Sequence, residues 1–159
     1  MRLAVALAVA VALAQPALAL SCMAPDIARD YASAAQSDDR YIIVKGDLFL
    51  DETALPDRVG QSQTSRHDSR DIAGWLAGHS LTRDGFAKPF ERDVILRVSC
   101  VGPWCGGTVK GEHLAFLKQE DQHWVMQIAP CPGMTYADPT QELEETVLAC
   151  IRGETCTRD

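Results

Sequence analysis

The segment YIIVKGDLFL, residues 41–50, carries the clearest secondary-structure signal in the chain. It is rich in β-branched and aromatic residues, and toward its end Val44, Leu48 and Leu50 are separated by charged residues. Alternation of apolar and polar residues is typical of a β-strand with one buried face and one exposed face. The pattern therefore predicts a strand over residues 41–50.

A short helix is predicted immediately before this strand. Pro25 and Asp26 suit the start of a helix, and apolar residues recur over 27–35 at the spacing of one helical face. The polar residues 38–40 follow this pattern and end it. The strand is therefore expected to begin directly after a helix.

The segment that follows the strand, residues 51–70, is polar and has no periodic apolar pattern. We expect an exposed, mobile loop there, which is a natural place for recognition. Two further strands are predicted, over residues 72–81 and 94–98. A loop is expected between them, over residues 82–92, because this segment contains a glycine and a proline.

Two more strands are predicted over residues 113–119 and 124–128, joined into a hairpin by the charged turn 120–122. Five antiparallel strands with a helix at each end, and no βαβ alternation, indicate a mainly β fold. The choice lies between a five-stranded barrel of the OB type and a compact sandwich. The barrel is favoured.

The C-terminal segment, residues 138–153, changes to a helical period. Its apolar residues from Leu143 to Ile151 form one stripe. Asp138 can cap the start of this helix, Pro139 suits its first turn, and Gly153 suits its end. The chain is therefore expected to close with a helix.

The first nineteen residues have the order of a secretory signal peptide, with Arg2, an apolar run, and small residues up to Ala19. Cleavage after Ala19 would leave one domain over residues 20–159 in the periplasm or outside the cell. A cut after Ser21 is the alternative. Acylation of Cys22 is disfavoured, because Ala19 stands where a lipoprotein signal normally has Leu.

The chain is acidic, with 15 Lys and Arg against 22 Asp and Glu and a formal net charge of −7. Loss of the leader removes one cation and no acid, and makes the mature chain one unit more negative. An acidic surface repels phosphate backbones and anionic lipids. We expect no nucleic-acid partner, and no later segment is long and apolar enough to span a membrane.

All six cysteines follow the leader, and an even number in an exported chain predicts three disulfides. Six cysteines allow 15 pairings, so that spacing alone leaves the connectivity open. Two of them, near the C-terminus, are close enough to close a short loop. The six are Cys22, Cys100, Cys105, Cys131, Cys150 and Cys156.

Over most of the mature chain, the order of elements and cysteines resembles the netrin-like family, which includes the inhibitory domains of the tissue inhibitors of metalloproteinases. In that family the mature chain begins Cys-x-Cys, and a Cys-Gly pair precedes a strand hairpin that ends at another cysteine. Leu20-Ser21-Cys22, Cys105-Gly106 and Cys131 match these features here. The terminal helix likewise ends at a cysteine, as in the family.

The resemblance implies a pairing of the six cysteines. Cys22 corresponds to the second cysteine of the family and should pair with Cys131, while Leu20 stands in place of the first. Cys105 is then left to bond Cys100, and the last two cysteines bond each other. The alternative joins Cys22 to Cys105 and Cys100 to Cys131.

The resemblance also implies a function. The family's inhibitors present the α-amine and carbonyl of their first residue to a catalytic zinc that keeps one position open. Leu20, Ser21 and Cys22 are therefore candidate binding residues, although Leu20 lacks the disulfide that holds this end rigid in the family. Trp104, in a turn beside a cysteine, is a candidate anchor for a protein partner, either a protease or another envelope protein.

No catalytic, metal or cofactor motif emerges, and the chain is expected not to be an enzyme. The stretch WCGG at residues 104–107 superficially resembles a thioredoxin site, but its second thiol is missing at Thr108. The three tryptophans are expected mainly in the core.

The four histidines have no zinc-hydrolase spacing. Two of them, His113 and His123, could face each other across the hairpin, but two solvent-facing strand histidines are expected; the others are His67 and His79. A thiol- or metal-dependent envelope enzyme and an accessory structural protein remain as alternatives.

Overall fold

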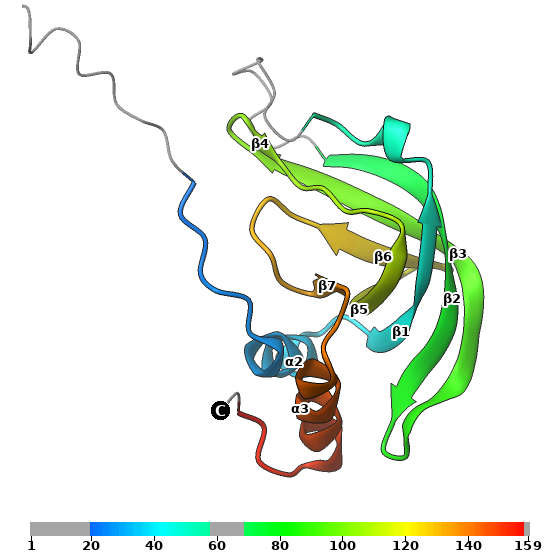
Figure 1. Cartoon of the computed structure of the whole chain (residues 1–159), viewed down its shortest axis with the longest axis vertical. Helices are drawn as coiled ribbons and strands as arrows, with labels where there is room; N and C mark the ends of the chain where they lie inside the picture. Colours follow the sequence, from blue (N-terminus) through cyan, green and yellow to red (C-terminus); the bar gives the residue numbers. More distant parts are fainter. Residues whose placement is uncertain (1–19, 58–68, 158–159) are drawn as a thin grey trace, which may run out of the picture.

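The computed structural model describes residues 20–57 and 69–157 of the chain. The expected leader and most of the expected loop over 51–70 lie outside these residues. Figure 1 shows a curved sheet with two helices packed at one side. In chain order the elements are α2 (Ile27–Gln36), β1 (Tyr41–Leu50), the 3-10 turn η1 (Glu52–Ala54), β2 (Ser69–Thr82), β3 (Gly85–Val101), β4 (Trp104–Cys105), β5 (Gly111–Glu120), β6 (His123–Ile128), β7 (Thr135–Ala137) and α3 (Gln141–Arg152).

Five strands of the sheet close into a ring. Strand β1 pairs with β2, β2 with β3, β3 with β6, β6 with β5, and β5 returns to β1. All of these pairs are antiparallel except β3 and β6, which are parallel. The expectation of five antiparallel strands was therefore wrong at one junction. An odd number of strands cannot alternate in direction all the way around a closed ring, so at least one pair must be parallel.

The apolar side chains form two clusters, one on each face of β1 and β5. The first draws on all five ring strands and includes Leu48, Leu76, Leu96, Leu117 and Met126. The second joins the outer face of β1 and β5 to the two helices and includes Ile27, Ile43, Leu114, Phe116 and Val147. Strand β5 is therefore covered on both faces.

The predicted strand over 41–50 is confirmed at both ends, and the one over 72–81 lies within β2. The loop expected over 82–92 was wrong, because only residues 83 and 84 form a turn and β3 begins at Gly85. Gly85 has a φ of 110° and serves the turn itself. Pro89 is compatible with the strand, because β3 pairs with β6 only from Ile95 onward and, among the described residues, no strand pairs with that edge before it.

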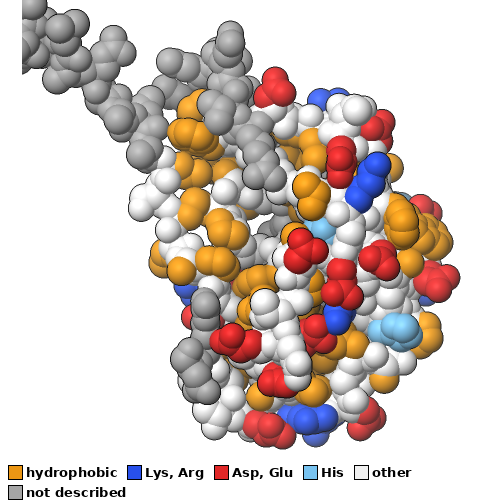
Figure 2. Space-filling model, in the orientation of Figure 1, with side chains coloured by type: hydrophobic (Ala, Val, Ile, Leu, Met, Phe, Trp, Pro, Cys, Tyr) orange, Lys and Arg blue, Asp and Glu red, His pale blue; other side chains and the backbone are white. Residues whose placement is uncertain are grey.

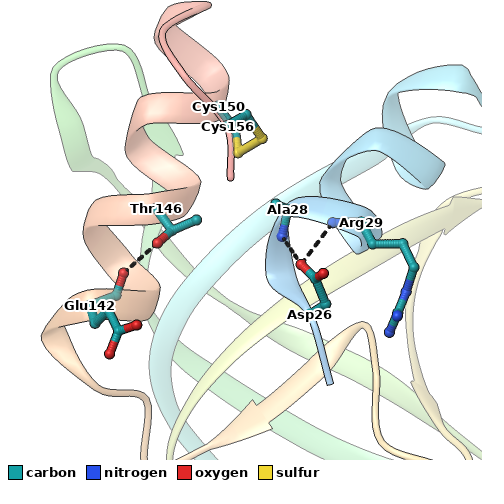
Figure 3. Close-up of a disulfide and its surroundings, with 7 residues drawn as sticks. All are labelled: Asp26, Ala28, Arg29, Glu142, Thr146, Cys150 and Cys156. Carbon is teal, nitrogen blue, oxygen red and sulfur yellow. Dashed lines mark hydrogen bonds between the residues drawn. A yellow bond between two sulfur atoms is a disulfide. The ribbon is translucent and has the colours of Figure 1, made fainter. Parts of the chain in front are cut away.

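Both predicted helices are confirmed, but the second begins later than expected, so that Pro139 precedes its cap and does not lie in its first turn. Asp26 caps α2 by accepting hydrogen bonds from the backbone N–H groups of Ala28 and Arg29, at 3.0 and 3.1 Å (Figure 3). Helix α3 is capped by Thr140, not by Asp138 as expected. Gly153 ends α3 in the left-handed conformation, as its position predicted. Among the described residues no helix is long and apolar enough to cross a membrane.

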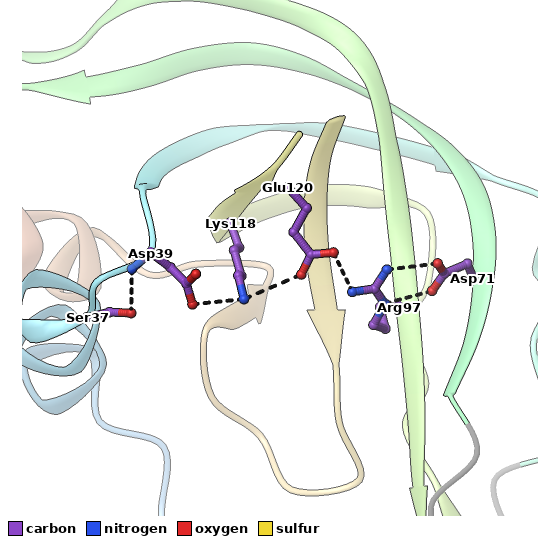
Figure 4. Close-up of polar contacts among 6 residues, drawn as sticks. All are labelled: Ser37, Asp39, Asp71, Arg97, Lys118 and Glu120. Carbon is purple, nitrogen blue, oxygen red and sulfur yellow. Dashed lines mark hydrogen bonds and ion pairs between the residues drawn. The ribbon is translucent and has the colours of Figure 1, made fainter. Parts of the chain in front are cut away.

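A network of charged side chains connects the strands on the outside of the ring (Figure 4). The guanidinium of Arg97 on β3 donates to both carboxylate oxygens of Asp71 at 2.9 Å and to Glu120 at 2.7 Å. Lys118 lies 2.8 Å from Asp39 and 3.5 Å from Glu120. Three strands and the segment after α2 are thus linked by alternating charges.

Candidate functional site

Three disulfides cross-link the described chain, as the even number of cysteines predicted. They join Cys22 to Cys131, Cys100 to Cys105, and Cys150 to Cys156, which is the pairing that the resemblance implied. The first connects residues 109 positions apart and ties the extended start of the described chain to the loop between β6 and β7. The second crosses the short β3–β4 hairpin, and the third fixes the chain after α3 (Figure 3).

A pocket of about 340 Å³ lies beside the first of these disulfides. Its walls come from the connection between β4 and β5, the end of β6, the β6–β7 loop and β7. In Figure 2, apolar side chains gather on the side of the molecule where β4 and the β6–β7 loop lie in Figure 1. The lining residues include Cys105, Thr108, Ile128, Pro130, Cys131 and Thr135.

Gly106 allows one wall of this pocket to form. A Cβ atom at this position would overlap the backbone carbonyl of Ile128, so only glycine permits the two segments to approach this closely. The N–H of Gly106 donates to the carbonyl of Ser99 at 2.9 Å and holds the segment in place. Close packing against Ile128 therefore explains why a glycine follows Cys105 in this chain.

The β6–β7 loop, which also lines the pocket, is held by Asp30, a buried carboxylate on α2. Asp30 accepts hydrogen bonds from the N–H of Met134 at 2.8 Å and from the hydroxyl of Tyr136 at 2.5 Å. Burial, together with the bond to Asp30, raises the pKa of Tyr136, so that its hydroxyl keeps its proton. The β6–β7 loop is thus fastened at Cys131 by a disulfide and at Met134 by a helix side chain.

His113 lies fully buried next to the pocket and corrects the histidine prediction. Its Nδ1 lies 2.9 Å from the carbonyl oxygen of Gly111, and its Nε2 lies 2.8 Å from the hydroxyl of Thr108. A carbonyl can only accept, so Nδ1 carries a proton and donates it to Gly111.

The other histidines do not join it. His113 is in register with Gly46 on β1 and Ala137 on β7, whereas His123 is exposed on β6 opposite Glu120. The expectation that both face solvent was wrong for His113, because β5 is buried on both faces. His79 is exposed on β2, and His67 lies outside the described residues. In residues 20–57 and 69–157, no group of three or more His, Cys, Asp or Glu could hold a metal.

The predicted binding residues lie at this end of the molecule. Leu20 is half-buried and Ser21 and Cys22 are exposed, with Cys22 attached to the pocket lining through Cys131. Trp104 is half-buried in β4, opposite Val101 and next to Cys105.

Three exposed apolar residues also lie here, of which sequence reasoning missed Met23 and Val109. Met23 follows Cys22 and is 72% exposed, Val101 is exposed opposite Trp104, and Val109 is exposed where it lines the pocket. Met23 and Val109 lie in no periodic pattern, so only the structure could find these two. We call residues 20–23, Val101, Trp104 and the pocket together the N-terminal edge.

Comparison with protein-family models, with curated proteins and with solved structures finds no match to this chain.

Proposed function

We propose that this chain is an exported binding module that holds a protein partner at its N-terminal edge. The observation that carries the proposal is the bond between Cys22 and Cys131, which fastens an exposed apolar stretch beside a pocket. Met23 and Val109 offer apolar surface that a partner could remove from water. A surface already ordered by cross-links loses less conformational freedom on binding than a free chain end does.

The strand order supports the finer part of the proposal, a netrin-like barrel of the OB type. The ring runs β1, β2, β3, β6, β5 and back to β1, with a parallel junction between β3 and β6. A five-stranded Greek-key sheet that closes on itself is expected of an OB-type barrel, and with five strands one pair must be parallel. Strands β4 and β7 are then additions to its rim.

A protease is the partner class that the resemblance favours. If cleavage follows Ala19, the α-amine and carbonyl of Leu20 begin a segment that the Cys22–Cys131 bond holds two residues further on. An amine and a carbonyl on adjacent atoms can fill the open position of a catalytic zinc. Inhibition would then depend on a free amine at Leu20.

Site-specific photo-crosslinking in the producing cell tests the binding module. A photoreactive amino acid is introduced at Met23 or Val109 and, as a matched exposed control, at Asp84 in the β2–β3 turn. We expect a cross-linked protein at positions 23 and 109 and none at 84. Equal labelling at all three positions, or none at 23 and 109, would contradict the proposal.

The protease assignment has its own test. Mature protein beginning at Leu20 is assayed against a panel of zinc endopeptidases, beside a variant that carries one extra alanine before Leu20. Inhibition that the extra residue abolishes supports the zinc-directed role. A cross-linked partner that is not a protease would support the proposal of a binding module and contradict the proposal of a protease inhibitor.

A further inference from the structure

Two large aromatic side chains lie side by side on the outer surface of the sheet, away from the N-terminal edge. Phe49 on β1 and Trp75 on β2 are directly opposite each other and are 54% and 40% exposed. The expectation that Trp75 belongs to the core was wrong. Figure 2 shows apolar side chains at the side of the molecule where β1 and β2 run, with acidic side chains around them. The fold gives no reason for this exposure.

Carboxylates occupy the neighbouring positions on the same face. Asp93 on β3 is opposite Trp75, and the next row along the strands carries Asp47 on β1 and Glu91 on β3. Residues two apart on a strand point to the same side of the sheet, so all three share the face of the aromatic pair. All three are exposed, and none has an ion-pair partner within the described residues. We call these five residues the aromatic face.

An open groove of about 660 Å³ continues from this face and is also acidic. Its lining includes Asp47 and Glu91 and, beyond them, Glu112 and Glu144. Lys45 is the one lysine or arginine among the lining residues, and it already lies 2.6 Å from Glu144 and 3.6 Å from Glu112. The groove therefore keeps an excess of negative charge.

We propose that the aromatic face and its groove bind an arginine- or lysine-bearing segment of a basic protein. A guanidinium or ammonium group is attracted to the face of an aromatic ring, and Trp is the strongest of these rings. The same cation has only donors to offer, and the three carboxylates around the pair offer only acceptors. Arginine can also bind a carboxylate through two parallel hydrogen bonds.

Two other occupants fit this face less well. A second copy of the chain would bring Asp47, Glu91 and Asp93 of one molecule against the same residues of the other in a twofold interface. Like charges in contact oppose that pairing. A sugar is the other occupant. Its hydroxyl groups both donate and accept hydrogen bonds, but ionised carboxylates have no proton to donate, so the hydroxyl oxygens would find no donor among them.

The test measures binding of a fluorescent hexa-arginine peptide to the mature, disulfide-bonded protein at low salt, by anisotropy. Trp75→Ala removes the ring, and the pair Glu91→Gln and Asp93→Asn removes two charges from the face. The matched control, Asp84→Asn with Glu154→Gln, removes two exposed charges elsewhere. Near-ultraviolet circular dichroism checks that each variant is folded.

We expect each change on the aromatic face to weaken binding by about 3- to 30-fold, and the control by less than about 2-fold. A hexamer of citrulline, the neutral analogue of arginine, should not bind. The proposal is overturned if the control weakens binding as much as the face variants do, or if citrulline binds equally well. Binding of a chitin oligosaccharide in place of the peptide, or dimerisation lost in Trp75→Ala, would also overturn it.

Discussion

At the scale of single residues, the pocket depends on a glycine without a side chain as much as on a buried carboxylate. Gly106 has no side chain where the carbonyl of Ile128 passes, and Asp30 supplies the buried carboxylate that accepts hydrogen bonds from Met134 and Tyr136. Removing a buried acceptor leaves its donors unpaired, which costs more than the bond contributes. Both residues therefore stabilise the segments that line the pocket of the N-terminal edge.

We predict that Gly106→Ala destabilises the protein, because its new methyl group meets backbone that cannot rotate away. The unfolding free energy should fall by about 2–3 kcal/mol, which is in the usual range for an overpacked site. Urea denaturation measures the change. Gly74→Ala is the control, since its methyl would meet the side chain of Leu96 at 3.3 Å, which can yield. A loss in Gly74→Ala as large as in Gly106→Ala would contradict the backbone explanation.

At the scale of elements, the charged network on β2, β3 and β5 links strands that are far apart in sequence. Hydrogen bonds from Arg97 lower the pKa of both Asp71 and Glu120, while the two carboxylates raise the pKa of Arg97. A carboxylate whose pKa is lowered in the folded state stabilises the fold above its ordinary pKa. That contribution is lost as the pH falls through the lowered value. The network is partly exposed, so solvent weakens each pair.

We predict that Arg97→Met lowers the unfolding free energy by about 1 kcal/mol near neutral pH, the upper range for exposed ion pairs. The difference from the unaltered protein should shrink below about pH 4, where carboxyl groups ordinarily take up protons. Urea denaturation at several pH values measures it. Arg92→Met on the same strand is the control, because Arg92 is exposed and forms no ion pair among the described residues. A difference that stays constant down to pH 2 would argue against this network.

At the scale of the whole molecule, the ring of five strands and the long-range disulfide act together. The bond between Cys22 and Cys131 spans 109 positions, whereas that between Cys150 and Cys156 spans only 6. In the loop-entropy account, a bond that closes a longer loop restricts the unfolded chain more. The bond at the N-terminal edge should therefore contribute most to stability.

We predict that Cys22→Ser with Cys131→Ser lowers the unfolding free energy by about 5 kcal/mol, against about 2 kcal/mol for Cys150→Ser with Cys156→Ser. Urea denaturation under non-reducing conditions gives both values. Releasing the chain end should also reduce photo-crosslinking at Met23 in a protein that is still folded. Equal losses in the two pairs would show that loop length does not set the effect here.

Several features could be predicted from sequence because they depend on near neighbours along the chain. Residues 41–50 alternate and form a strand with those bounds, and Asp26 and Gly153 mark helix ends. The candidate binding residues could be predicted from the sequence only in part. Cys22 and Trp104 stood out by type and context, whereas Met23 and Val109 carry no local signal.

The amino-acid sequence by itself determined the positions of the five ring strands and the two helices and the presence of three disulfides, but neither the early start of β3 nor the short strands β4 and β7. Alternation, capping and an even number of cysteines are local or countable properties. Only the tertiary structure decided that β3 and β6 run parallel, that His113 is buried and that Trp75 is exposed. Those outcomes depend on which strands become neighbours and on what covers each face. Closure of a five-stranded ring requires one parallel pair, and here it is β3 with β6. The two helices pack on the outer face of β5, so that this strand is buried on both faces, whereas Trp75 lies outside both apolar clusters.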